Sequence, residues 1–132
     1  MPLREAASLG CGWASKAGLP RPENWRVGSG TNGAAPTGRC DLIHGDKEVG
    51  EDEYRLTFAA WYGDWSNRLT REEGEPRDLT ATARCAGEAA NFALGGPDKV
   101  PGIDRGGLRD LLETFARDQL ERRDCSGLQV WG

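Results

Sequence analysis

The chain has 132 residues, a length that fits one domain with a single hydrophobic core. Its 21 acidic and 17 basic side chains give a formal net charge of −4, which favours solubility and argues weakly against a polyanionic partner. No segment approaches the ~20 consecutive apolar residues that span a bilayer, and the opening residues are too charged for a secretory signal. We therefore expect a single cytoplasmic domain over residues 1–132.

The first part of the chain, residues 1–50, is predicted to be an irregular arm. Residues 1–53 hold nine Gly and four Pro, and neither helical nor strand periodicity persists there. The exception is a short helix expected over residues 2–9, which Gly10 would end. Because so long an irregular segment is uncommon in a compact domain, we expect the arm to pack on another surface.

Residues 54–69 are predicted to form the first long helix. Their large apolar residues are spaced by four, three, four and four positions, which is the spacing of one helical face. Glu51, Asp52 and Glu53 would lie in its first turn and favour the positive end of the helix dipole. Gly74 and Pro76 would end it. The residues of the predicted apolar face are Tyr54, Phe58, Trp61, Trp65 and Leu69.

Two further helices and an extended tail complete the expected fold. The second helix begins near Pro76 and ends at Gly95, and the third covers residues 107–124, with Asp104 near its N-cap. Residues 128–131 alternate between apolar and polar, which indicates an edge strand or a tail pinned by Trp131. The expected fold is therefore mainly α: a three-helix unit over residues 51–132, with the arm wrapped across it. The apolar faces consist of Leu79, Ala83, Ala86, Ala90, Ala93 and Leu94 in the second helix, and of Leu108, Leu111, Leu112, Phe115, Ala116 and Leu120 in the third.

The four cysteines are Cys11, Cys40, Cys85 and Cys125, and no two of them have the short spacing of a zinc knuckle. We expect free, mostly buried thiols in a reducing cytoplasm and no bound cofactor. Disulfides are one alternative. The other is a structural zinc held by Cys40, His44 and two distant cysteines such as Cys11 and Cys85.

Cys40 and His44 could also form a nucleophile and its base, because on a helix residues four apart share one face. His44 is the single histidine of the chain, so any acid–base mechanism that uses histidine must use it. Asp41 or Asp46 would orient the imidazole. A small enzyme is therefore an alternative function, although residues adjacent in sequence rarely give this geometry.

The N-terminal arm carries the candidate binding residues Trp13, Arg21, Trp25 and Arg26. Tryptophan and arginine dominate the anchors of protein interfaces, and an arm poor in apolar residues needs a surface to hold it. The leading prediction is a small non-enzymatic accessory, inhibitor or regulatory protein that binds a protein partner. Arginine outnumbers lysine 14 to 3, which is typical of bacterial or phage proteins from GC-rich genomes. Because residues 1–40 combine a small basic excess with tryptophan, single-stranded nucleic acid is the alternative partner.

Overall fold

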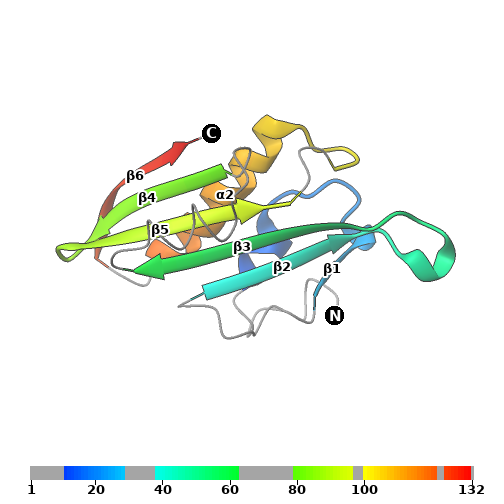
Figure 1. Cartoon of the computed structure of the whole chain (residues 1–132), viewed down its shortest axis with the longest axis horizontal. Coiled ribbons are helices and arrows are strands. Elements are labelled where there is room, and N and C mark those ends of the chain that lie inside the picture. The colour runs from blue at the N-terminus through cyan, green and yellow to red at the C-terminus, as the bar shows by residue number, and fades with distance from the viewer. Residues whose placement is uncertain (1–10, 29–37, 63–78, 97–99, 122–123, 132) are drawn as a thin grey trace.

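In the residues that the structure describes, the protein is a six-stranded antiparallel sheet with one long helix packed along one face (Figure 1). The computed structural model describes residues 11–28, 38–62, 79–96, 100–121 and 124–131. The strand order is β1-β2-β3-β5-β4-β6. The strands are β1 (Trp25–Val27), β2 (Gly38–His44), β3 (Tyr54–Tyr62), β4 (Leu79–Cys85), β5 (Glu88–Gly95) and β6 (Cys125–Trp131), and the helix is α2 (Arg105–Leu120).

Strand β3 lies near the middle of the sheet, between β2 and β5. Leu56, Phe58 and Ala60 alternate along it and are fully buried on the face that α2 covers. The strand is also rich in aromatic residues and contains Thr57, residue types that favour strands. The alternation of buried residues, which is typical of a strand, therefore prevails in this segment over the helical spacing of its large apolar residues.

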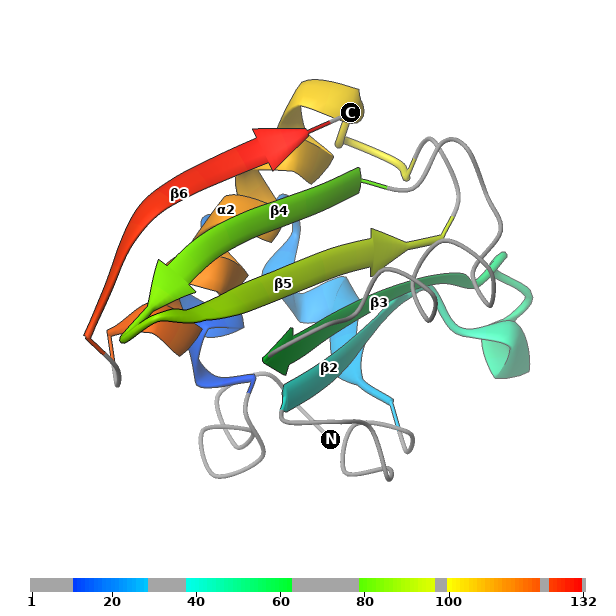
Figure 2. The ribbon, with the colours of Figure 1, turned by 60° about the vertical axis from the view of Figure 1, so that its left-hand side comes forward.

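Strands β4 and β5 form a tight hairpin that is visible in Figure 2. Ala86 and Gly87 form its two-residue turn, and their φ angles of 51° and 85° are those of a type I′ turn. Alternate residues of the two strands point into the core, among them Leu79, Ala81 and Phe92. The small alanine side chains on this face leave room for the helix above it.

Helix α2 begins where Asp104 caps it, since the carboxylate accepts a hydrogen bond from the Gly107 amide at 2.8 Å. Its buried face packs on β3, β4, β5 and β6. Glu113 and Arg117 form an ion pair of 3.6 Å on its outer face. No helix in the described ranges combines the length and the apolar composition that a membrane crossing requires. The buried face consists of Leu108, Leu111, Leu112, Phe115, Ala116 and Gln119.

Phe115 occupies the centre of the core. Its ring lies 5.5 Å from that of Phe58, 5.7 Å from that of Trp13 and 6.2 Å from that of Phe92. Trp13 belongs to the short 3-10 helix Gly12–Lys16, which lies on the same side of the sheet as α2. The cluster therefore joins the helix, the sheet and the N-terminal segment.

The expectation of a mainly α, alpha-helical fold is wrong. The helix predicted over residues 54–69 is strand β3 as far as Tyr62, and residues 63–69 lie outside the described ranges. The second predicted helix is the β4–β5 hairpin. The predicted irregular arm contains two strands of the sheet, because β1 pairs with β2 and β2 pairs with β3. The short helix expected over residues 2–9 also lies outside the described ranges.

Two sequence-based predictions are confirmed. The third helix is present as α2, with Asp104 at its N-cap. The alternating tail is the edge strand β6, which pairs with β4. Both predictions concern segments in which a single periodicity fits the sequence.

The cysteines form two disulfides, so the expectation of free thiols is wrong. Cys11 is bonded to Cys40, which ties the N-terminal segment to β2. Cys85 is bonded to Cys125, and these residues face each other at one end of β4 and β6. Since all four sulfurs are consumed, none is a thiolate that could hold zinc.

We expect Phe115→Ala to lower the free energy of unfolding by about 3 to 5 kcal/mol, because it empties the centre of the aromatic cluster. A urea titration followed by far-UV circular dichroism measures the change. Glu113→Gln, in the same helix, should cost less than about 1 kcal/mol, since the ion pair it breaks is exposed. Equal stability of Phe115→Ala and the unaltered protein would contradict the assigned core.

We expect the double variant Cys85→Ser/Cys125→Ser to lose about 2 to 5 kcal/mol of stability, because these cysteines close a loop with a sequence separation of 40 residues. Before this comparison, a thiol reagent should label no cysteine in the unfolded, unreduced protein and all four after reduction. Labelling of four thiols without reductant would contradict both disulfides.

Candidate functional site

The two tryptophans that were predicted to bind a partner lie in the core. Trp13 is 4% exposed and Trp25 is 3% exposed. The indole N–H of Trp25 donates to the Pro20 carbonyl at 3.0 Å, and its ring meets that of His44 edge-on at 4.9 Å. Neither ring therefore presents a face on which a nucleic-acid base or a partner side chain could stack.

The two predicted arginines have different surroundings. Arg21 is exposed and lies just before the short 3-10 helix Pro22–Asn24. Arg26, on β1, is half-buried and binds groups of its own chain. Trp25 and Arg26 are neighbours in one strand, but their side chains lie on opposite faces of the sheet. The structure thus does not gather the four predicted residues at one surface.

Cys40 and His44 do not form a catalytic pair. Both lie in β2, where residues four apart are separated by about 13 Å along the strand. Cys40 is also bonded to Cys11. Among the described residues, no three His, Cys, Asp or Glu side chains are grouped so that they could hold a metal ion.

The most distinctive surface feature is the connection between β2 and β3, residues 45–53, which we call the 45–53 loop. It projects from the end of the sheet (Figure 1) and contains the short 3-10 helix Lys47–Val49. The Asp46 carboxylate caps this turn by accepting from the Glu48 amide at 2.9 Å. The Asp46 carbonyl accepts from the amides of Val49 and Glu51 at 3.2 and 3.0 Å. The loop is therefore organised by its own hydrogen bonds.

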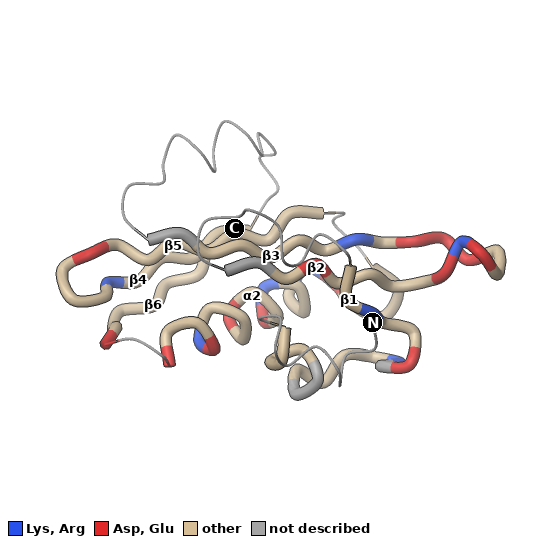
Figure 3. The backbone as a smooth tube through the Cα atoms, turned by 90° about the horizontal axis from the view of Figure 1, so that it is seen from below, with Lys and Arg blue, Asp and Glu red and all other residues tan. Residues whose placement is uncertain are grey.

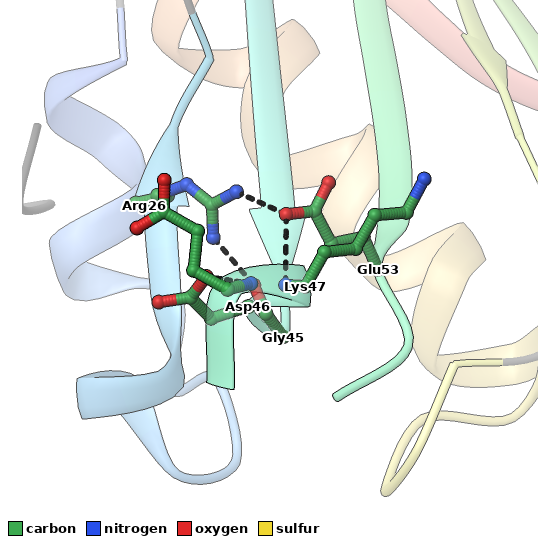
Figure 4. A network of polar contacts seen from close by, with 6 residues as sticks. Arg26, Gly45, Asp46, Lys47 and Glu53 are labelled. Carbon is green, nitrogen blue, oxygen red and sulfur yellow. Dashed lines mark hydrogen bonds and ion pairs between the residues drawn. The ribbon is translucent and has the colours of Figure 1, made fainter. Parts of the chain in front are cut away.

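Arg26 fastens the base of the loop to β1 (Figure 4). Its guanidinium donates to the Gly45 carbonyl at the end of β2 and to the Glu53 carboxylate, 2.8 Å away, at the start of β3. The same Glu53 oxygen accepts from the Lys47 amide at 3.2 Å. Both ends of the loop and its helical turn thus share one polar network.

Gly45 is required by the close approach of the loop's two ends. Its φ is 92°, and a Cβ built there would lie 1.9 Å from the Asp52 carbonyl oxygen. Its amide donates to the Asn24 carbonyl at 3.2 Å. Any side chain at this position would push the loop off its base.

The tip of the loop presents Val49, which is 71% exposed and is the one exposed large hydrophobic side chain in the described ranges. Glu48, Glu51 and Asp52, in the same loop, are exposed as well. Residues 46–53 hold five of the 21 acidic and one of the 17 basic side chains, so the rest of the chain carries 16 of each. The loop therefore has the same net charge, −4, as the whole protein. Figure 3 shows the charged residues of this loop at the end of the β2–β3 hairpin that projects beyond the sheet.

Sequence reasoning noted the acidic run but assigned it to the start of a helix. The signal that it missed is Gly50, which adopts a positive φ of 84° directly after the exposed apolar residue. An apolar residue followed by glycine within an acidic run, between two β-rich segments, is compatible with a hairpin loop.

Comparison with family models, with curated proteins and with solved structures gives no match for this chain. The functional argument consequently rests on the residues themselves.

Glu53 provides a pH test of the network. The hydrogen bond from Arg26, and then that from the Lys47 amide, hold the pKa of Glu53 below its ordinary value of 4.5. Because the pKa is lower in the folded protein, the contribution of Glu53 to stability is present above pH 4.5 and is lost as the pH falls below it. In Arg26→Met we expect this pKa to rise toward 4.5, as measured by carbon-13 NMR of the carboxyl group. Glu23→Gln, an exposed control, should leave the titration of Glu53 unchanged.

Proposed function

We propose that this protein is a non-enzymatic binding protein, an inhibitor or a regulator, that docks its 45–53 loop onto a protein partner. The complementary surface on the partner is a small apolar pocket bordered by lysine or arginine side chains. Val49 enters the pocket, and Glu48, Glu51 and Asp52 face the basic border.

The proposal rests on one observation: the 45–53 loop combines a concentrated acidic charge with an exposed apolar side chain. The net charge of residues 46–53 equals that of the whole chain, and the same segment carries the exposed Val49. Because a concentrated charge steers the encounter with an oppositely charged surface, this arrangement favours fast association in one orientation.

The polar network supports the same proposal. A loop that is already ordered loses little conformational entropy when it binds, so more of the contact energy appears as affinity. Arg26 and Asp46 provide this order through contacts at the base and within the turn. Arg26, expected from the sequence to touch the partner, acts in this proposal as a positioning residue.

The disulfides bear on where the protein works. Thiols are kept reduced in the cytoplasm, whereas disulfides persist in oxidising compartments. Because all four cysteines are paired, we propose an oxidising compartment, such as a periplasm or the cell exterior, in preference to the cytoplasm expected from the sequence.

The proposal is tested by affinity capture from the source organism with the oxidised protein as bait. At least one protein should be retained by the unaltered chain and by the control Gln129→Ala, which alters an exposed residue of β6. The same protein should be lost with Val49→Asp, because a charge replaces the apolar anchor. With the captured partner purified, Glu48→Gln/Glu51→Gln/Asp52→Asn should slow association by about tenfold at low salt. If all variants retain the same proteins in the same amounts, the loop is not the docking site.

A further inference from the structure

A second surface feature is a groove of about 630 Å³ between the N-terminal segment and the first half of α2. This volume lies in the range of small-molecule sites, which is roughly 300 to 1,000 Å³. Leu19, Val100, Ile103 and Leu111 form an apolar floor, and each is less than a tenth exposed. None of these residues belongs to the 45–53 loop.

Two glycines let the residues that line the groove pack closely on one another. A Cβ added at Gly102 would lie 3.1 Å from Pro20 Cγ. At Gly107 it would lie 2.8 Å from Ile103 Cγ2, in the floor. A side chain at either position would therefore displace residues that line the groove.

The rim of the groove is negatively charged. Asp104 and Asp110 are exposed and line it, and the described lining contains no lysine or arginine. Arg109, the neighbour of Asp110, donates instead to the Val130 carbonyl on β6 at 2.9 Å. Asp104, the N-cap residue, and Asp110 lie six residues apart, which is about 9 Å along the helix axis and about a third of a turn around it.

The positive end of the helix dipole does not outweigh the negative charge of the rim. It carries roughly half a positive charge, which would favour an anion, but the carboxylates bring two full negative charges. One oxygen of Asp104 already accepts from the Gly107 amide, so the capping need of the helix is met within the chain. Within the described lining, the charge of the groove therefore favours a cation over an anion.

We propose that the groove binds a small amphiphilic amine, with its apolar body on the floor and its ammonium group at the rim that carries Asp104 and Asp110. The negative charge of the two carboxylates attracts the ammonium group, and the hydrocarbon displaces water from the apolar floor. This inference is independent of the proposed role of the 45–53 loop.

The test is a titration of the full oxidised chain with 4-phenylbutylamine, followed by nitrogen-15 NMR. The expected result is saturable binding with a Kd of about 1 mM or tighter, with the largest shifts at the amides of Gly102, Gly107 and Leu111. The uncharged 4-phenylbutanol and the anionic 4-phenylbutyrate should bind at least fivefold more weakly.

Matched variants separate the groove from general acidity. Asp104→Ser/Asp110→Asn should weaken binding of the amine at least fivefold, and serine at position 104 still caps the helix. Asp124→Asn removes an exposed carboxylate outside the groove and should leave the Kd unchanged. Shifts centred on residues 46–53, or equal affinity of the groove variant and the control, would overturn the proposal. Equal binding of the alcohol would also overturn it.

Discussion

Phe115 is the side chain through which α2 holds the sheet, and the rings of Trp13, Phe58 and Phe92 surround it. These residues come from the N-terminal segment, β3, β5 and the helix, so one cluster unites elements far apart in the sequence. Aromatic side chains bury 150 to 250 Å² each, which is more than an aliphatic residue offers. A chain with only 22 Leu, Ile, Val and Phe residues among 132 thereby closes a core.

On β4 and β5 several of the core side chains are small, and this gives the two disulfides a role in stabilising the fold. Strands β4 and β5 turn Ala81, Ala83 and Ala90 toward the helix, and alanine contributes little buried area. Each disulfide joins segments that are distant in the sequence: Cys11 is bonded to Cys40 on β2, and Cys125 holds β6 against β4. Covalent links that restrict the unfolded chain compensate for a modest hydrophobic contribution.

The 45–53 loop is stabilised by a different kind of interaction. It contributes no buried residue within its helical turn, and its shape depends on hydrogen bonds to Asp46, Gly45 and Glu53. Its tip can therefore vary without repacking the aromatic cluster. The groove beside α2 is different, because its floor is made of core residues and only its rim is free to change.

The segments that the sequence alone determined are those in which one periodicity fits. The 3.6-residue spacing over Leu108, Leu111 and Phe115, with a capping aspartate before it, has no strand equivalent, so α2 could be predicted. In β3 the apolar and aromatic residues fit both the helical and the strand period. Tyr54, Phe58 and Trp61 suit a helix, and Leu56, Phe58 and Ala60 suit a strand. Pairing with β2 and β5 decided between them, and such long-range contacts are not written in a local pattern. The pairing of the cysteines, the burial of Trp13 and Trp25, and the exposure of Val49 depend on the same sheet, and only the tertiary structure decided them.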